Sequence, residues 1–307
     1  MDYASARALL ERLGGFLDQF VGCFGRRTQR EGASRYVQGL LNDSPRKSIQ
    51  ALHGRLGDAG SYQGLQHFIS HSPWEAARLW RQLRAAPQVR RGLLLIDETS
   101  FPKQGAHSVA VARQYCGALG KIANCQVAVT TALVADGLSW PTTIELFVPH
   151  AWIDEPSRRE AAGIPATVRY QEKWRIALRH IRQVRASGLT IDAVLGDAEY
   201  GKVPTFRRAL ERMGLRYALG VPACSFVAPA GARQHQAIGD VAAGLRPPRG
   251  AASGGARGPR GRSSRASRPC GCARRSASRT AGSCASGRSP APRIANIIWC
   301  RRRPPGR

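Results

Sequence analysis

The sequence predicts an α/β protein with a mixed β-sheet core, an all-helical domain before it and a disordered C-terminal tail after it. Three observations support this fold class. Apolar residues recur every three or four positions up to about Leu83, which is typical of amphipathic helices. From Gly92 to about Pro222, short β-branched runs alternate with helical stretches. After Leu245 aliphatic residues become rare, so burial there cannot offset the entropy lost on ordering.

The helical domain is expected over residues 1–88, with a chain break at Ser44-Pro45 before another helix. Its first helix is predicted by the spacing of Leu9, Leu10, Leu13, Phe16, Leu17 and Phe20. The loops of this domain are expected to carry Arg26, Arg27, Arg30, Arg46 and Lys47. Basic loops between helices suit DNA phosphates, and they suit a solvated surface equally well. Both interpretations stay open.

The α/β core is expected over residues 89–245. Strands are predicted at 93–100, 108–117, 125–134 and 145–149, then a helix at 173–187 and a strand at 192–201. A helix at 204–214 opens on Pro204 and closes on Gly214, and a last strand follows at 216–222. The segment order is β-β-β-α-β-α-β.

Charge is unevenly placed along the 307 residues. The net charge is +27 and the isoelectric point about 11.3, a balance that favours binding to a polyanion, most commonly nucleic acid. Residues 246–307 contain 16 Arg and no Lys, Asp or Glu, which leaves the first 245 residues at +11. This tail is either a natural disordered basic segment or an out-of-frame translation of GC-rich DNA. We favour the frame change, because natural nucleic-acid tails usually include Lys and some repeat.

Several other classes of protein are disfavoured. The eight Cys, at positions 23, 116, 125, 224, 270, 272, 284 and 300, lack paired CxxC spacing and a His cluster, which argues against a zinc site, and we expect the first four to be reduced thiols. His67 and His71 have i, i+4 spacing, and we interpret them as partly buried structural histidines in preference to metal ligands. The N-terminus has no signal-peptide layout and no apolar run could span a membrane, so we expect a cytoplasmic protein.

Two acids occupy matching positions in the predicted core. Asp97 ends the apolar run LLLI, and Asp197 ends AVLG. A parallel crossover would place their strands side by side, so that the two carboxylates face each other at the strand ends. Two acids so close repel unless a cation lies between them, which suggests a divalent-metal site. Together with the strand order, this pair indicates the ribonuclease-H-like arrangement, while strand alternation should point Glu98 and Glu199 elsewhere.

At this point the chain resembles a known family. IDETSFPKQGAHSVAVARQYCGALGKIANCQVAV (96–129) and VLGDAEYG (194–201) are similar to the transposases of the IS701 group, which are DDE endonucleases with a ribonuclease-H-like core. The similarity extends upstream through RYVQGLLNDSPRKSIQAL and LQHFISHSPWE, and downstream through PHAWIDEPSRREAAGIP to YALGVP. It covers about 240 residues.

The resemblance implies that Asp97 and Asp197 are catalytic and hold Mg²⁺ or Mn²⁺, with two ions in an intact family member. The family's third acid, a Glu in an Arg-Trp-x-x-Glu setting after the last core strand, has no counterpart here, and Asp240 follows the strand too soon to replace it. Lys103, Arg113 and Lys121 are candidates for contacts with DNA phosphates. The implied partners are insertion-sequence ends and target DNA, with a homo-oligomer forming on the DNA.

Three functions follow from these residues. The first is a transposase that cleaves and joins DNA, inactive in this form because the chain is truncated or frame-shifted near residue 245. The second is a non-catalytic DNA-binding remnant that competes with intact transposase, in the bacterial cytoplasm near the nucleoid. The third is a nuclease or resolvase with a similar core, which the long resemblance makes the least favoured.

Overall fold

The computed structural model describes residues 3–43, 47–56, 60–87, 89–222, 225–227, 234, 236–238, 240–241 and 297–300. Contacts divide the chain into two compact units, Met1–Val221 with Ile298–Arg307, and Pro222–Ile297. The described part of the second unit contains a short antiparallel ladder of β7 (Phe226–Val227) and β8 (Gln236–Ala237). All other elements discussed below belong to the first unit, apart from the first residue of the last strand.

Helices account for the regular structure described before Arg91. They pack around Phe20, Phe24 and Phe68, with Trp74 stacked on Phe68. Gly32 permits this packing, since a Cβ there would lie 2.8 Å from the ring of Phe68. These helices are α1 (Tyr3–Asp18), η1 (Val21–Cys23), α2 (Arg27–Leu41), α3 (Ile49–His53), α4 (Tyr62–Ser70) and α5 (Ala76–Ala85).

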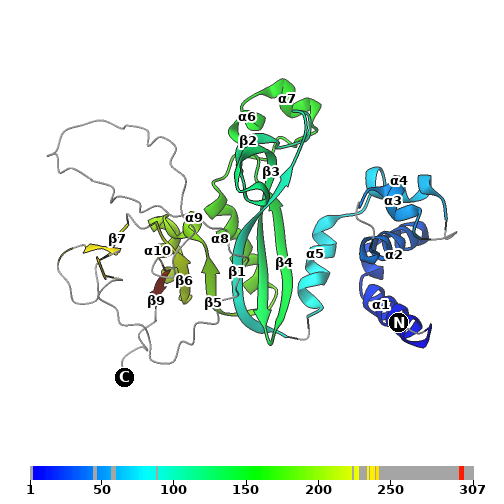
Figure 1. Cartoon of the computed structure of the whole chain (residues 1–307), viewed down its shortest axis with the longest axis horizontal. Helices are drawn as coiled ribbons and strands as arrows, with labels where there is room; N and C mark the ends of the chain where they lie inside the picture. The colour runs from blue at the N-terminus through cyan, green and yellow to red at the C-terminus, as the bar shows by residue number, and fades with distance from the viewer. Residues whose placement is uncertain are drawn as a thin grey trace, which may run out of the picture. The chain divides into compact units, whose positions relative to one another are not determined.

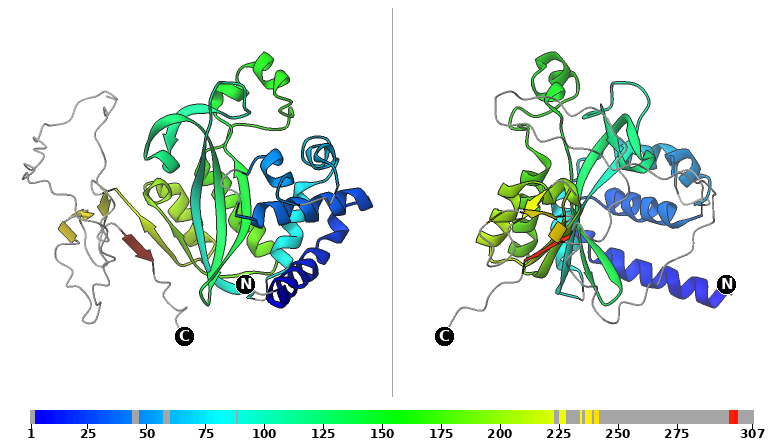
Figure 2. Two further views of the ribbon diagram at one scale, coloured as in Figure 1. Left: turned by 45° about the vertical axis from the view of Figure 1, so that its right-hand side comes forward. Right: turned by 60° about the vertical axis from the view of Figure 1, so that its left-hand side comes forward.

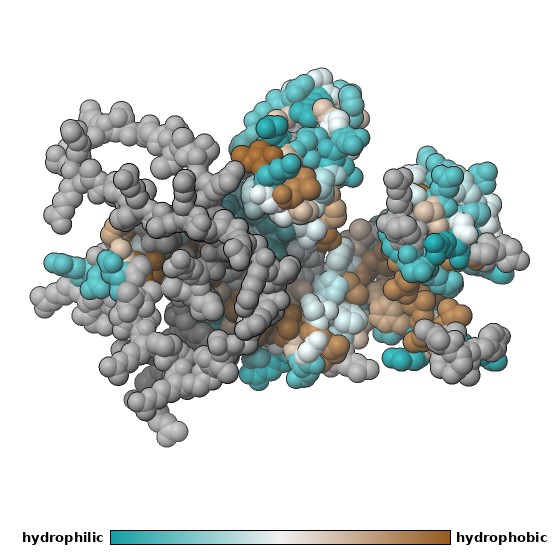
Figure 3. All heavy atoms as spheres, viewed as in Figure 1, coloured by the Kyte–Doolittle hydropathy of each residue, from teal (hydrophilic) through white to brown (hydrophobic). Residues whose placement is uncertain are grey.

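Two expectations about this helical region need correction. Arg27 and Arg30 lie inside α2 and not in a loop, because the helix begins directly after Arg26. His67 and His71 are exposed and stack on each other at 5.6 Å, so they are not buried structural histidines. Ser44, Pro45 and Arg46 lie outside the described residues. On the face drawn in Figure 3, apolar residues gather over α1, and Leu9 and Leu10 are among the exposed residues of this helix.

A mixed sheet forms the core of the first unit and confirms the predicted fold class. Its strands are β1 (Arg91–Pro102), β2 (Ala112–Cys116), β3 (Lys121–Ala135), β4 (Leu138–Leu146), β5 (Thr190–Gly196), β6 (Tyr217–Gly220) and β9 (Ile297–Cys300). The order is β2-β3-β1-β5-β6-β9, with β4 also paired to β3. The pairs within β1 to β4 are antiparallel, and β5 is parallel to both β1 and β6 (Figures 1 and 2).

The strand predicted at 145–149 is wrong. The structure has β4 at Leu138–Leu146 instead, because Asp136 and Gly137, with φ of 52° and 76°, turn the chain directly from β3 into β4. An Asp-Gly pair with two positive φ angles is the preferred two-residue hairpin turn, and this signal was readable in the sequence. From the predicted tail, residues 246–307, the structure describes only β9, which lies next to β6, and the rest falls outside the described residues.

The remaining helices connect the strands. They are η2 (Gly117–Leu119), α6 (His150–Ile153), α7 (Pro156–Ala161), α8 (Lys173–Ala186), α9 (Ala198–Gly201) and α10 (Pro204–Arg212). The long helix α8 covers one face of the sheet, where its Ile176 and Ile181 share a core cluster with Leu94 and Ile96 of β1. Burial alternates along β1, so the face of the sheet opposite α8 carries Leu93 and Leu95, which are 39% and 37% exposed.

Within the described residues, no helix combines the length and apolar character needed to cross a membrane.

Candidate active site

The two predicted acids lie on neighbouring strands. In the parallel pairing of β1 with β5, Leu95 is opposite Leu195 and Ile96 is opposite Gly196. Asp97 is the next residue of β1, and Asp197 follows the last residue of β5. Side chains two positions apart share a face of a strand, so both acids continue the face of Leu95. Both are exposed, on the face of the sheet opposite α8.

Each carboxylate is oriented by a backbone N–H close to it in sequence. Glu98 N donates to Asp97 Oδ1 at 2.7 Å, and Glu199 N donates to Asp197 Oδ1 at 3.0 Å as Asp197 caps α9. Thr130 of β3 donates its hydroxyl to the Asp97 carbonyl at 3.0 Å, which ties this part of β1 to its antiparallel neighbour. Among the described residues Asp97 Oδ2 has no hydrogen-bond partner, so one oxygen remains for a ligand.

The two carboxylates influence each other electrostatically. Asp197 is exposed at the surface, but the surrounding protein shields its carboxyl group from part of the solvent, and this desolvation raises its pKa above the ordinary value. The negative charges of Asp97 and Glu199 raise the pKa further, while backbone N–H groups of Glu199 and Tyr200 lower it. A divalent cation between the carboxylates would remove this repulsion. Two Asp on one face, with an oxygen free, therefore fit as part of a Mg²⁺ or Mn²⁺ ligand set.

Close backbone packing fixes the position of α9 and thus of Asp197. A Cβ at Gly201 would lie 1.8 Å from the carbonyl oxygen of Gly220, so only glycine lets the end of α9 touch β6. Gly220 has the reciprocal constraint, because its own Cβ would lie 2.9 Å from Ala198 N. Gly201 is therefore required for the placement of the second acid, a role that sequence reasoning missed.

Glu98 lies on the opposite face of β1 from Asp97. It pairs with Lys173 of α8 at 2.6 Å, and its Oε1 is buried without a hydrogen-bond partner among the described residues. Burial raises the pKa of Glu98, and the ion pair with Lys173 partly offsets that shift. Within the same described part of the chain, the neighbouring Tyr200 hydroxyl is also buried without a hydrogen-bond partner, and burial together with the Glu98 charge raises the pKa of Tyr200. Glu98 thus lies on the α8 side of the sheet and does not face the space between the two Asp.

No third ligand joins the pair among the residues that the structure describes. That part of the chain contains no group of three His, Cys, Asp or Glu arranged to hold a metal ion. Glu199 is exposed and pairs with Lys202 at 2.8 Å, and Asp240 is exposed in the second unit. Among the described residues, the candidate metal site therefore has two carboxylates.

The three basic candidates lie away from the acids. Arg113 is exposed and sits opposite Asn124, six positions along β3 from the residue that faces Asp97, or roughly 20 Å at strand spacing. Lys103 directly follows β1, and its backbone N–H bonds to Asn124 O. Lys121 opens β3 opposite Cys116. Nearness in sequence to Asp97 did not mean nearness in space, because β1 and β3 are long extended strands.

Two exposed aromatic residues share the face of the two Asp and were not singled out from the sequence. Phe101 is four positions beyond Asp97 on β1 and is 40% exposed. Tyr115 is 64% exposed on β2, opposite Ile122, which is 61% exposed. Alternation along the strands was the available signal, but assigning the face required the register between β2 and β3.

The fold and the paired Asp define a class of protein, an α/β domain of the ribonuclease-H-like type with two carboxylates on adjacent strands. The chain belongs to the DDE superfamily endonuclease family, whose model matches residues 19–282. That match reaches past Leu245 into the Arg-rich segment.

Individual relatives agree with this family. The chain is 32% identical over 201 residues to a protein of Microchaete diplosiphon described as "Probable transposase for insertion sequence element IS701", which confirms the resemblance to the IS701 group. The match covers 64% of this chain and 50% of that protein, so the chain spans about half the length of this relative. A solved structure titled "Drosophila P element transposase strand transfer complex" matches with 10% identity and a TM-score of 0.30, over 66% of this chain and 40% of that one.

Proposed function

We propose that this chain derives from a DNA transposase of the DDE type, which acts on insertion-sequence ends by phosphodiester hydrolysis and strand transfer. The observation that carries the proposal is the placement of Asp97 within β1 and of Asp197 directly after the adjacent parallel strand β5, toward the same face of the sheet. Family membership and the similarity to a protein named as an IS701 transposase support the same reaction class. We place the protein in the bacterial cytoplasm near the nucleoid, as an oligomer on DNA.

In this proposal Asp97 and Asp197 hold Mg²⁺ or Mn²⁺. Such ions activate a water or a 3′-hydroxyl and stabilise the leaving oxygen in phosphodiester chemistry. The protein's own contribution is to position the carboxylates: Thr130 and the Glu98 N–H fix Asp97, and the cap of α9 fixes Asp197. Lys173 keeps Glu98 neutralised beneath them.

DNA would lie along the face of the sheet that carries the acids. From Asp97 this face leads through Phe101 to Tyr115 and Arg113 on the β2–β3 hairpin. Arginine suits a phosphate, and exposed aromatic rings suit unpaired bases by stacking. The distance of roughly 20 Å between Asp97 and Arg113 corresponds to about six nucleotides, at 3.4 Å between successive phosphates of one DNA strand. Lys103 and Lys121 are assigned to phosphates at the same hairpin.

The chain as given is proposed to be inactive, since its described residues supply two of the three carboxylates. Misplacement of a reacting group by about 1 Å can cost on the order of 100-fold in rate, so a loosely held second ion should abolish useful catalysis. The same observation favours an alternative function, a non-catalytic DNA-binding remnant that competes with intact transposase for element ends.

An end-cleavage assay in Mg²⁺ tests the catalytic proposal. The chain is compared with a version whose reading frame is restored after Leu245, each with Asp97→Ala and Asp197→Ala controls. We expect cleavage only from the restored version, abolished by either substitution. Cleavage by the unrestored chain that depends on both Asp would show that the third ligand lies within residues 1–245.

DNA binding is tested by deleting residues 246–307. We expect binding to persist, because the remaining +11 charge stays, while its salt dependence becomes shallower with the loss of 16 Arg. Gel shifts across a salt series measure both effects. Complete loss of binding would assign the contact to the tail and remove the helical domain and core as DNA-binding elements.

A further inference from the structure

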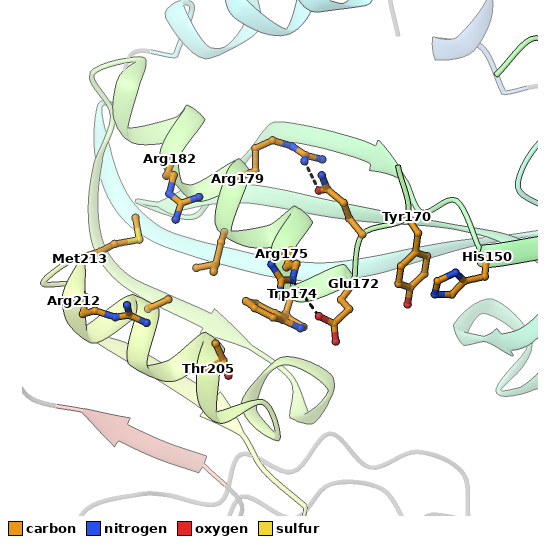
Figure 4. A pocket seen from close by; sticks show the side chains of 13 residues that line it. His150, Tyr170, Glu172, Trp174, Arg175, Arg179, Arg182, Thr205, Arg212 and Met213 are labelled. Atoms are coloured by element: carbon orange, nitrogen blue, oxygen red, sulfur yellow. Dashed lines mark hydrogen bonds and ion pairs between the residues drawn. The ribbon is translucent and has the colours of Figure 1, made fainter. Parts of the chain in front are cut away.

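A groove outside the candidate active site lies between α8 and α10. Its volume is about 950 Å³, and Trp174, Leu178 and Met213 provide apolar surface within it. Figure 4 shows Arg182 of α8 and Arg212 of α10 at the end near Met213, with Tyr170 and His150 at the other end. The two rings of that pair stack at 3.5 Å.

The groove is on the opposite side of the sheet from Asp97 and Asp197. The helix that forms one wall, α8, packs on Leu94 and Ile96, and its Lys173 reaches Glu98 on that face. The two Asp lie on the other face. A ligand in the groove therefore cannot be the phosphodiester that meets the acids, and the two sites must contact different segments.

Charge in the groove is strongly positive. Arg175, Arg179 and Arg182 recur at i, i+4 and i+7, which places them along one side of α8. Arg175 is paired with Glu172 at 3.1 Å and Arg179 is paired with Glu145. Arg182 has no acidic partner among the described residues, and nor does Arg212, whose Nε contacts only the Arg208 carbonyl at 3.4 Å.

The spacing of these arginines suits a polymer better than a single phosphate. Arg182 lies seven positions after Arg175 on α8, which corresponds to a rise of roughly 10 Å along the helix axis. This rise equals the length of about three nucleotides of one DNA strand. The side chains line two helices and do not converge on one point. The chain's own residues 246–307 are excluded as the occupant, because they contain 16 Arg and no acid and would be repelled.

We propose that the groove between α8 and α10 binds the phosphate backbone of a second DNA segment, with Arg182 and Arg212 as its principal contacts. Guanidinium groups without an acidic partner can pair with phosphate without first breaking an ion pair. Trp174, which packs under Arg175 at 4.7 Å, supplies a flat apolar wall. This inference rests on DNA as the partner in the proposed function, but it does not depend on catalysis.

The chain offers a matched control on the same two helices. Arg185 of α8 and Arg208 of α10 are exposed, and neither lines the groove. Arginine modification by phenylglyoxal, mapped by mass spectrometry on the full chain with and without a short DNA duplex, compares the two pairs within one sample. We expect the duplex to protect Arg182 and Arg212 and to leave Arg185 and Arg208 reactive. Equal protection of both pairs would overturn the proposal.

Variants add a quantitative test. Each phosphate neutralised contributes about 0.9 to the slope of log K against log salt, so Arg182→Ala with Arg212→Ala should lower that slope by about 1.8. Arg185→Ala with Arg208→Ala removes the same charge and should change it far less. Equal changes in the two double variants, or no change in the first, would contradict a specific groove.

Two further footprinting experiments distinguish DNA from an acidic protein as the ligand of the groove, and groove binding from catalysis. If polyglutamate protects Arg182 and Arg212 better than the duplex does, the groove is a surface for an acidic protein and the DNA assignment is wrong. The footprint is also repeated on the chain with Asp97→Ala and Asp197→Ala, where protection should persist. Failure of the cleavage assay with an intact footprint would then count only against the catalytic proposal.

Discussion

Removing the cation beneath the candidate active site should destabilise the fold in a pH-dependent way. Lys173→Met keeps the length of the side chain and leaves Glu98 buried without its partner. Breaking a fully buried ion pair costs about 3–5 kcal/mol. Here the side chains of Lys173 and Glu98 are 24% and 18% exposed, so we expect a loss of about 2–3 kcal/mol in the free energy of unfolding at pH 7.

The direction with pH follows from the pKa of Glu98. Burial already raises it, and loss of Lys173 removes the interaction that opposes this rise. Above the ordinary Glu pKa of about 4.5 the unfolded chain releases the proton while the folded variant retains it, so the variant loses stability as pH rises through that window. The loss of stability should therefore be smaller at pH 5 than at pH 7.

Urea unfolding of the variant and the parent chain at both pH values measures this effect. The control is Lys173→Met combined with Glu98→Gln, which removes the buried charge and should recover most of the lost stability. An equal loss at pH 5 and pH 7, or a double variant no more stable than Lys173→Met, would refute the role assigned to the pair.

Three more predictions concern the site and the sheet. Gly201→Ala should lower the free energy of unfolding by about 1–3 kcal/mol or more, since its Cβ would lie 1.8 Å from a carbonyl oxygen of β6. The control, Gly14→Ala in α1, has nothing within 4 Å and should be neutral or stabilising by about 0.5–1 kcal/mol. Chemical unfolding compares the two variants. Asp97→Asn removes a negative charge that raises the pKa of Asp197, so the melting temperature should rise by about 1–3 °C at pH 7. This gain should vanish as pH falls below about 4. Calorimetry that finds no gain at pH 7 would contradict repulsion between the two carboxylates. Leu93 and Leu95 are more than a third exposed on the face opposite α8, and exposed apolar surface favours association between copies of the chain. Leu95→Thr should therefore lower self-association measured by light scattering. Unchanged self-association would exclude this face as the surface through which copies associate.

Much of the architecture could be predicted because periodicity is a local property of the sequence. The alternating burial of β1 and the period of α8 were both visible in the residues, and these two elements form the core. The boundary of β4 differs from the prediction because its hydrophobic pattern is interrupted by Pro141, and because the Asp136-Gly137 turn sets its start. The exposure of His67 and His71 could not be foreseen, since i, i+4 spacing fixes a shared side of a helix but not what covers it.

The sequence by itself determined that two acids would directly follow apolar runs and that the chain resembles the IS701 group, because both depend on residue types in order. The expected position of Asp97 at a strand end was wrong, since β1 continues to Pro102. Only the tertiary structure decided that Asp97 and Asp197 share a face, since this depends on the register between β1 and β5. It also separated Glu98 from them, by turning it toward Lys173, and brought Arg182 and Arg212 to one groove from helices 30 residues apart in the chain. Pairing across a sheet and packing between helices join residues distant in sequence, so no local pattern could specify them.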